Sequence, residues 1–459
     1  MGNNQCGQNR VREPGIEAQS DKGKALVQDL PDKIYRKKGF MKIAVIGAGI
    51  IGVTTAYELA CDGHEVTVLE RRGATAEEGS FANAGLMGSG YISPWAAPGM
   101  PGKVLRHLFS RHASVHLGGS LSTRELAWIW KWVGACKPLV HAANRSNLQR
   151  LAQYSRARLH YITAHLNLEY ERSDGCMVLL RSERDSKLMQ PDLQVLRDAG
   201  VAFKELSPEE TRKIEFALNP DTSFHSAVHL PNDEVGNCRQ VALMIKSEAQ
   251  RIGVNFSFNT CVKQINTSNG SGVDIGVYGE NSPRPFDAAV MCAGLESTRF
   301  LEPLGVKIPM AAVHGYSVSA TIREPLNAPR SAVMDEHYKI TISRLGNRVR
   351  VAGSAELGGS LQNKRSAAFR TLYKTLNDWF PGASNLSNGA QEWKGALTML
   401  PDGAPVLGAS GVRGLWLNLA HGTSGWALSC GSARVIADLI AGKTPEMDVT
   451  EFGIERLQT

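Results

Sequence analysis

The pattern of apolar and polar residues changes sharply at Met41. Residues 1–40 are polar and show no sustained periodicity, so we expect a disordered N-terminal extension. A compact series of apolar elements follows: a strand at Lys42–Ile46, a helix at Ile50–Cys61 and a second strand at Glu65–Leu69. This order predicts a β-α-β unit at the start of the folded chain.

Helices and strands continue to alternate after this unit. A tryptophan-rich helix is expected to begin near Ser122, where Ser122-x-x-Glu125 forms a capping box, and a long amphipathic helix is expected to reach Leu166. We expect further helices at Asp192–Ala199, Pro208–Lys213, Arg239–Arg251 and Trp426–Ile440, and strands at Val254–Phe258, Phe286–Cys292, His314–Thr321 and Arg348–Ala352. Such alternation is typical of the α/β class.

Composition adds little to this picture, but the charge distribution adds more. The 459 residues carry a net charge of +7, and the window 91–150 accounts for all of it. This window holds one acid, Glu125, four tryptophans at positions 95, 128, 130 and 132, and the cations Lys103, Arg106, Arg111, Arg124, Lys131, Lys137, Arg145 and Arg150. The pattern suits either peripheral contact with an anionic membrane or a basic surface with the tryptophans packed inside. Nucleic acid is not expected as a partner, because no binding motif accompanies the charge.

Two further features concern the compartment. No apolar stretch approaches the roughly 18 residues that a bilayer-spanning helix needs, and the N-terminus lacks the apolar core of a secretory signal. The eight cysteines have no metal-binding spacing, so we expect reduced thiols, no metal site and a cytoplasmic protein.

The most specific local motif is Gly47-Ala48-Gly49-Ile50-Ile51-Gly52, which follows a strand and opens a helix. The first two glycines allow a tight turn and close approach to a pyrophosphate, and the third allows close packing of helix and strand. Glu70 ends the second strand 18 residues later, where an acid accepts hydrogen bonds from ribose hydroxyls. We therefore expect dinucleotide contacts from Ile46 through Gly52 and from Glu70 and Arg71.

A second glycine loop distinguishes between the possible dinucleotides. Leu415–Trp426 predicts a strand, the loop Gly422-Thr423-Ser424-Gly425 and a helix start of the type that binds anions. Reduced flavin carries negative charge near N1, which a helix start would stabilise. NAD requires no such second element, so FAD is favoured, and the small residues Ala293 and Gly294 after an apolar strand would allow its close approach.

Several short motifs occur in an order that is known from one family. They are Ser80–Gly85, Ser93–Gly99, Leu230–Glu234, Gly315–Ser317, Tyr338–Ile340, Pro401–Gly403, and His421–Trp426 followed by Cys430–Ser432. From Met41 nearly to the C-terminus, the chain resembles the D-amino-acid oxidase-like FAD-dependent oxidoreductase superfamily, most closely its bacterial D-amino-acid dehydrogenase subgroup.

The resemblance implies a Rossmann-type FAD-binding domain and a discontinuous α+β substrate domain built on an antiparallel-rich sheet. The FAD-binding domain would comprise 41–100, 225–300 and 393–445, with the helical segment 101–168 packed on it, and the substrate domain would comprise 169–224 and 301–392. FAD would be held non-covalently. The further implied FAD contacts are Ser80, Asn83, Ala84, Gly85, Val262, Ala293, Gly294, Gly422, Thr423, Ser424 and Gly425.

The resemblance also implies a reaction. A D-amino acid would lose hydride to flavin N5, and the imine would hydrolyse to a 2-oxo acid and ammonia. Electrons would pass to a quinone or another respiratory acceptor at the inner face of the cell membrane, or to oxygen. Two alternatives stay open: oxidation of a cyclic or N-substituted amine, such as a proline-like or sarcosine-like compound, and flavin binding without amine oxidation.

One position departs from the family pattern. Leu397 stands where the family places an arginine that binds the substrate carboxylate. Lys394, Arg344 or Lys339 could supply the cation from another direction, or the substrate could lack a carboxylate there. The substrate is therefore less well defined by the sequence than the cofactor.

The remaining candidates are single residues. By resemblance, Tyr316 and Tyr338 would line the substrate cavity. His337 beside Tyr338 and His421 in the glycine loop could contact substrate or flavin, and Tyr316, Tyr338 and His421 are the candidate catalytic residues. Each also has a purely structural interpretation. Cys430 is expected inside the last helix rather than in a flavin thioether. Asp233 and Glu234 are expected to cap the helix that follows them rather than to form a catalytic pair.

Overall fold

The computed structural model describes residues 40–88, 90, 92–107, 114–119, 121–267, 272–386 and 389–457. The expected disordered extension, up to residue 39, and Arg111 of the basic window lie outside these ranges. The folded unit begins at Met41.

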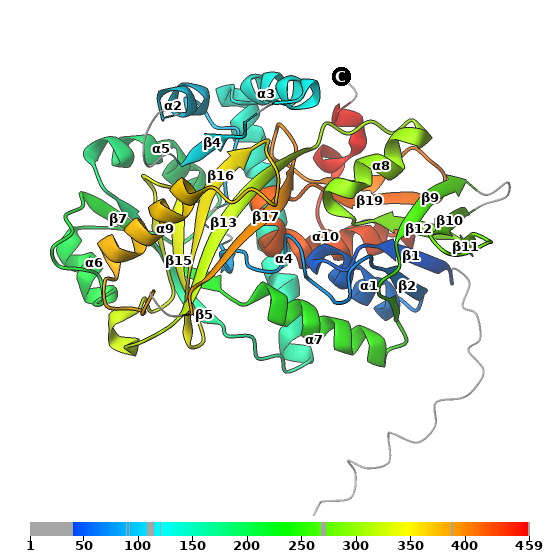
Figure 1. Cartoon of the computed structure of the whole chain (residues 1–459), viewed down its shortest axis with the longest axis horizontal. Coiled ribbons are helices and arrows are strands. Elements are labelled where there is room, and N and C mark those ends of the chain that lie inside the picture. Colours follow the sequence, from blue (N-terminus) through cyan, green and yellow to red (C-terminus); the bar gives the residue numbers. More distant parts are fainter. Residues whose placement is uncertain are drawn as a thin grey trace, which may run out of the picture. The chain divides into compact units, whose positions relative to one another are not determined.

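A six-stranded sheet carries the β-α-β unit (Figure 1). Its strands lie in the order β18 (Val406–Ala409), β19 (Leu415–Leu419), β12 (Ala288–Met291), β1 (Lys42–Ile46), β2 (Glu65–Leu69) and β8 (Asn255–Ser257). All neighbours are parallel except β18 and β19. The predicted bounds of β1, α1 (Ile50–Cys61) and β2 are confirmed.

Both faces of this sheet are covered. Successive side chains of β1 point to opposite faces, so Ile43 and Val45 join a core on the helical side, while Ala44 and Ile46 join a second core. A three-stranded antiparallel sheet forms much of the second core and comprises β9 (Val262–Thr267), β10 (Val273–Val277) and β11 (Arg284–Phe286). Burial on both faces explains why β1 is an unbroken apolar run.

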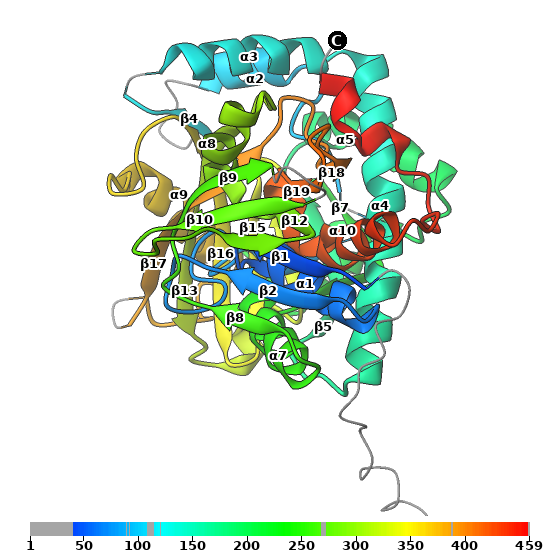
Figure 2. The ribbon, with the colours of Figure 1, turned by 90° about the vertical axis from the view of Figure 1, so that its right-hand side faces the viewer.

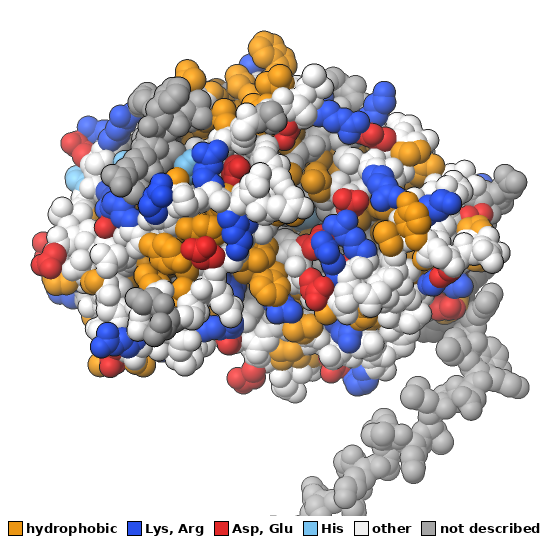
Figure 3. Space-filling view, viewed as in Figure 1, with side chains coloured by type: hydrophobic (Ala, Val, Ile, Leu, Met, Phe, Trp, Pro, Cys, Tyr) orange, Lys and Arg blue, Asp and Glu red, His pale blue; other side chains and the backbone are white. Residues whose placement is uncertain are grey.

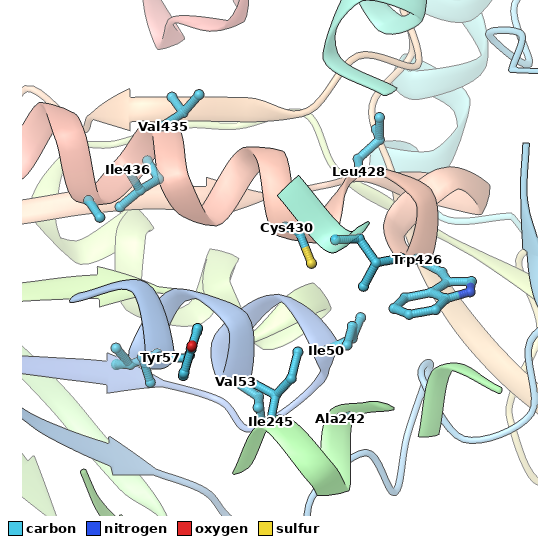
Figure 4. Close-up of a cluster of buried hydrophobic side chains, with 14 of the residues drawn as sticks. Ile50, Val53, Tyr57, Ala242, Ile245, Trp426, Leu428, Cys430, Val435 and Ile436 are labelled. Carbon is cyan, nitrogen blue, oxygen red and sulfur yellow. The ribbon is translucent and has the colours of Figure 1, made fainter. Parts of the chain in front are cut away.

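On the helical side, α1 lies between α7 (Cys238–Arg251) and α10 (Gly425–Ile440), as Figure 4 shows. The Thr54 hydroxyl donates to the Ser429 carbonyl of α10 at 3.3 Å. Glu58, fully buried, accepts from Arg158 of α4 (Pro138–His165) at 2.6 Å and from Arg434 of α10 at 2.9 Å. α4 runs past α1 and α10 (Figure 2), so three helices distant in sequence share one buried carboxylate.

A ten-stranded sheet forms the other half of the folded unit. Its main path is β17 (Gln391–Met399), β13 (Ala311–Thr321), β16 (Arg348–Leu357), β15 (Ile340–Leu345), β14 (Ala332–Asp335), β5 (Ser173–Leu180), β7 (Ser226–Val235) and β3 (Leu86–Met87). β4 (Val115–Leu117) pairs with β16, and β6 (Lys204–Leu206) pairs with β7. Most neighbours are antiparallel, and α9 (Ser366–Trp379) covers one face through Phe369 and Leu372. The predicted α/β fold with an antiparallel-rich second sheet is confirmed.

The remaining helices border the two sheets. They are α2 (Met100–His107), α3 (Thr123–Ala135), α5 (Glu183–Asp198), α6 (Pro208–Ile214) and α8 (Ser297–Leu301). The capping box at Ser122 begins α3, as predicted. α4 packs in the core beside α1, whereas α3 packs against the end of the ten-stranded sheet through Trp128 and Trp132. The segments 225–300 and 393–445 were expected in the FAD-binding domain. Strands β7 and β17, at the start of these two segments, pair within the ten-stranded sheet.

The expectation for Asp233 and Glu234 was wrong in part. Both residues lie within β7, and Asn237 caps α7 by accepting from the Gln240 amide at 3.3 Å. Asp233 accepts from the Gly90 amide at 2.8 Å, and Glu234 pairs with Arg172 at 2.6 Å. The two carboxylates are therefore held by structural partners.

Candidate active site

The glycine motif forms a tight turn between β1 and α1. Gly47 has φ +104°, and a Cβ atom there would lie 2.7 Å from the Cys292 carbonyl oxygen. A Cβ atom at Gly52 would lie 1.9 Å from the Gly47 carbonyl oxygen, so only glycine lets the helix approach the strand this closely. Gly49 is the N-cap of α1 and provides no side-chain cap, while the Ile50 amide donates to Ser80 Oγ at 3.1 Å, so a ligand would bind this helix start beside Ser80.

Glu70 lies beside this turn at the end of β2. Its carboxylate accepts from the Ala48 amide at 2.6 Å and from the Arg72 amide at 2.7 Å. Arg71 and Arg72 both pair with Glu78 at 2.7 Å. Glu70 is thus held by backbone groups beside the glycine turn, and its role toward a ribose stays a prediction.

The second glycine loop lies after β19. Ala420 adopts a left-handed conformation with φ +62°, and His421 follows it, before a short 3-10 turn at Gly422–Ser424 leads into α10. His421 Nε2 lies 3.0 Å from the Ser432 hydroxyl. Burial lowers the pKa of His421 to about 3, so its imidazole is neutral at physiological pH.

Strand β17 forms a third wall. Trp393 covers Gly395, because a Cβ atom at position 395 would lie 1.8 Å from the indole ring. Leu397 lies on the same side of the strand and also packs against the cluster of Trp95, Trp128 and Trp132. This wall is therefore apolar.

These three parts line one cavity of about 440 Å³. It brings together the following predicted residues: Ile46, Gly47, Gly49, Ile50, Ile51, Glu70, Arg71, Ser80, Asn83, Val262, Ala293, Gly294, His421, Gly422, Thr423, Gly425, Lys394 and Leu397. Ala48, Gly52, Ala84, Gly85 and Ser424 are not in its lining. Cys430 is buried inside α10, also outside the lining, and burial raises its pKa to about 12.

The other substrate candidates do not line this cavity. Tyr316 is buried against Phe369 and donates to Glu356. Tyr338 lies under the Arg181 guanidinium at 5.0 Å. The further positions are as follows: His337 Nδ1 is 3.5 Å from Asp185, Arg344 donates to the Pro325 carbonyl at 3.3 Å, and Lys339 pairs with Glu336.

Lys394 needs a separate correction. Only its strand position reaches the cavity, because its ammonium group is fully buried and pairs with Glu356 at 2.9 Å. Three other cations line the cavity in the described chain: Arg71 and Arg72, which pair with Glu78, and Arg299, which lies 3.9 Å from Glu296. The expectation that Lys394 or Arg344 replaces a cation at position 397 is therefore not supported by their contacts.

Sequence analysis missed several lining residues. They are Leu69, Arg72, Ala76, Glu77, Glu78, Gly79, Thr260, Cys261, Cys292, Leu295, Glu296, Arg299, Phe300, Leu361, Trp393, Gly395, Ala396, Thr398, Asn418, Leu419, Ala420 and Trp426. Trp393 and Gly395 stand four and two residues before Leu397, so the family pattern around that position could have indicated them. Asn418 gives no such signal, because it is a single polar residue within an apolar strand.

Comparison with known proteins assigns the family. A family model described as "FAD dependent oxidoreductase" matches residues 42–439. The chain belongs to this family. The D-amino acid dehydrogenase of Cereibacter sphaeroides is 41% identical over 420 residues, which are 91% of this chain and 95% of the relative. The D-amino acid dehydrogenase of Rhizobium rhizogenes is 39% identical over 91% of this chain and its own full length.

Solved structures of FAD-dependent oxidoreductases have a fold similar to that of this chain. Glycine oxidase from Geobacillus kaustophilus has a TM-score of 0.71 at 21% identity, covering 91% of this chain and 99% of its own. L-proline dehydrogenase from P. horikoshii has a TM-score of 0.68 at 18% identity, covering 92% and 99%. At these identities the likeness concerns the fold.

The residues fit the cofactor of an FAD-dependent oxidoreductase. The open start of α1, the acid Glu70 and the second helix start at α10 all face one cavity. Within the described part of the chain, Asn418 Oδ1 and Trp426 Nε1 are buried without a hydrogen-bond partner, and both residues line the cavity. Such groups are stabilised when a polar ligand satisfies them.

Proposed function

We propose that the protein oxidises D-amino acids to 2-oxo acids and ammonia. The observation that carries this proposal is the single cavity that joins both glycine loops to β17, so that a substrate on β17 lies beside the cofactor. The relatives of about 40% identity that bear the name D-amino acid dehydrogenase support the substrate class. When bound, FAD supplies the acceptor for the substrate hydride.

The residues of this chain have distinct roles in the proposal. When FAD is bound, the starts of α1 and α10 would hold its phosphates and the negative charge of the reduced ring, and Glu70 would hold the ribose. Trp393 and Leu397 exclude water from the wall where the substrate lies. His421 orients the substrate or the flavin and does not transfer protons, because burial lowers the pKa of its imidazole to about 3 and keeps it neutral. In this proposal the protein therefore contributes by positioning the substrate beside the cofactor and not by a strong acid or base.

An anaerobic reduction series tests this function. D-alanine, D-leucine, L-alanine, proline and sarcosine are each mixed with the purified holoprotein, and the flavin absorbance is followed. Bleaching by the D-amino acids and not by L-alanine is expected. Bleaching by none of the five, while dithionite bleaches the flavin, would contradict amine oxidation.

A second candidate is oxidation of a cyclic or N-substituted amine. The observation that favours it is the wall at Leu397, together with the acid partner near each described cation of the lining. A substrate that depends less on a carboxylate clamp would suit this wall. Bleaching by proline or sarcosine alone in the same series would select this candidate.

We also propose peripheral contact with an anionic membrane, where a respiratory quinone would accept the electrons. Three of the four tryptophans, Trp95, Trp128 and Trp132, pack inside, whereas Trp130 is 80% exposed. With Leu126 and Val133, Trp130 forms one exposed apolar face of α3, and Leu105 of α2 and Leu139 and Val140 of α4 are exposed as well. Figure 3 shows hydrophobic side chains at the upper edge, where α3 lies in Figure 1.

Exposed cations accompany this apolar face. Arg124, Lys131 and Lys137 are exposed around it, while Arg145 is buried against Asp192. The side chains of Lys103 and Arg106 lie outside the described part of the structure. Apolar groups inserted at headgroup level beside cations are typical of peripheral membrane binding. Among the described helices, none has the length and hydropathy required to span a bilayer.

Co-sedimentation with vesicles tests the membrane contact. Vesicles that contain about 30% phosphatidylserine should bind the holoprotein at low salt, and binding should weaken above the salt concentration that screens surface charge. The double variant Leu126→Glu/Trp130→Glu should lose binding, whereas Leu326→Glu, at another exposed leucine, should retain it. Equal sedimentation with and without vesicles at low salt would exclude the contact.

A further inference from the structure

Leu361 is a half-exposed leucine in the wall of the cavity. Leu361 is 49% exposed, and it lines the cavity together with Trp393 and Leu397 of β17. It lies in the connection between β16 and α9, in a segment of otherwise mostly polar residues (358–365), which we call the cavity loop. An apolar side chain at this place is stabilised only when another apolar group covers it.

The ammonium group of Lys394 fixes the middle of the cavity loop. Lys394 Nζ donates to Glu356 Oε2 at 2.9 Å, to the Ser360 carbonyl at 2.8 Å and to the Asn363 carbonyl at 2.9 Å. An ammonium group has three donors, so all three are used. Two of the three acceptors flank Leu361 in the sequence, and Lys394 thereby determines where the leucine lies.

Both ends of the cavity loop are also attached. Gly358 approaches the segment just before α3 so closely that a Cβ atom there would lie 2.9 Å from Leu121 Cδ2. At the other end, Lys364 donates to the Glu392 carbonyl of β17 at 3.1 Å, and Arg365 donates to the Leu117 carbonyl of β4 at 2.8 Å. The loop is therefore held at its start, middle and end, and Leu361 occupies a defined place.

From these contacts we infer that Leu361 is a specificity-determining residue and that Lys394 is the residue that positions it. Leu361, Trp393 and Leu397 form an apolar surface that takes the side chain of the substrate. Among D-amino acids, those with an aliphatic side chain larger than a methyl group are accordingly the preferred substrates, and D-alanine is a poorer one. This inference rests on the proposed D-amino-acid oxidation and narrows it.

Paired substrates test the inference. The kcat/KM values of the holoprotein for D-leucine and D-alanine give a selectivity ratio, which is measured in wild type and in Leu361→Ala. Removing the contact with the larger side chain should lower this ratio about 10-fold or more, because each methylene in an apolar pocket discriminates by about that factor. Leu361→Met, which conserves volume, should restore most of the ratio.

Two further variants distinguish the positioning role of Lys394 from a general loss of stability. Lys394→Met removes two attachments of the cavity loop and should lower the same ratio. Leu326→Ala truncates another exposed leucine, outside the cavity, and should leave the ratio unchanged. Folding of each variant is verified by its denaturation midpoint, and a Lys394→Met protein that fails to fold leaves the Leu361 variants to decide.

A binding measurement avoids turnover. Propanoate and 4-methylpentanoate are D-alanine and D-leucine without the amine, and their dissociation constants follow from the change in flavin absorbance. 4-Methylpentanoate should bind more tightly in wild type, and Leu361→Ala should remove most of this preference. Reduction by both D-amino acids with an unchanged ratio in Leu361→Ala would overturn this inference alone. Reduction by neither in wild type would overturn the proposed function and the inference with it.

Discussion

Lys394 Nζ lies 2.9 Å from Glu356 Oε2, and neither side chain is more than 5% exposed. Tyr316 donates to the same carboxylate. Although burial alone would raise the pKa of Glu356, the hydrogen bonds from Tyr316 and Lys394 and the charge of Lys394 hold it below its usual value. The ion pair joins β16 to β17.

Loss of one partner should destabilise the fold. In Lys394→Met the Glu356 carboxylate stays buried without its cation, which costs about 3–5 kcal/mol. The free energy of unfolding in urea measures this cost. The double variant Lys394→Met/Glu356→Gln should recover part of it, because no uncompensated charge is left, and a double variant as unstable as the single one would contradict the explanation.

Glu215 should make stability depend on pH in the opposite sense to most carboxylates. Burial raises its pKa to about 7, against weaker lowering by the Arg330 amide, which donates to Oε2 at 3.0 Å. Among the described residues, Oε1 has no hydrogen-bond partner. The folded state therefore holds this proton more tightly than the unfolded state, in which the pKa of the carboxyl is near its ordinary value of 4.5.

The sign follows from this difference. Stability from Glu215 is complete below about pH 4.5 and declines as pH rises through about 7, by up to about 3 kcal/mol. Glu215→Gln should remove this decline from urea unfolding measured between pH 5 and pH 8. An identical pH dependence in wild type and variant would show that another group is responsible.

The glycine turn predicts a specific effect on flavin content. In Gly52→Ala the new methyl group would overlap the Gly47 carbonyl oxygen, so the turn must open and the phosphate site is lost. We expect less than about one tenth of the wild-type ratio of flavin to protein absorbance, since binding depends on this close approach. Gly134→Ala is the matched control, because its Cβ atom in α3 meets no atom within 4 Å.

The position of Cys430 predicts how flavin leaves the protein. The thiol is buried inside α10 and is absent from the described cavity lining, and its raised pKa keeps it protonated. Acid precipitation should therefore release all the flavin into the supernatant, as its absorbance at the visible maximum measures. Flavin that stays with the precipitate would indicate a covalent bond.

The cofactor side could be predicted from sequence because its signals are local. The strand, the glycines and Glu70 fall within one short segment, and the bounds of β1, α1 and β2 are those expected. The substrate side depends on pairing between distant strands. A register shift places an extra residue of β16 opposite the step from His314 to Tyr316, so the cross-strand neighbours of Tyr316 do not follow from simple alternation. The partner of Lys394 is 38 residues away.

Helix caps gave a mixed result for a similar reason. Ser122-x-x-Glu125 is a local motif, and it caps α3. Near α7, the run Asp233–Glu234 resembled a cap, but β7 continues through it to Val235 before Asn237 takes that role. The pattern Asn237-x-x-Gln240 was available in the sequence. The length of β7 could not be predicted in the same way, because it depends on the pairing of β7 with β5.

The packing of α1 against α10 also constrains the order of events during synthesis. A ribosome that has translated four hundred residues has made the phosphate turn and most of both sheets, yet has not made α10, which covers α1 and supplies Arg434 to Glu58. Nascent chains of that length hold α1 covered by α7 but not by α10, and the Glu58 carboxylate has Arg158 as only one of its two cations. Flavin capture is accordingly a late step, and chains stopped before Gly425 should emerge colourless.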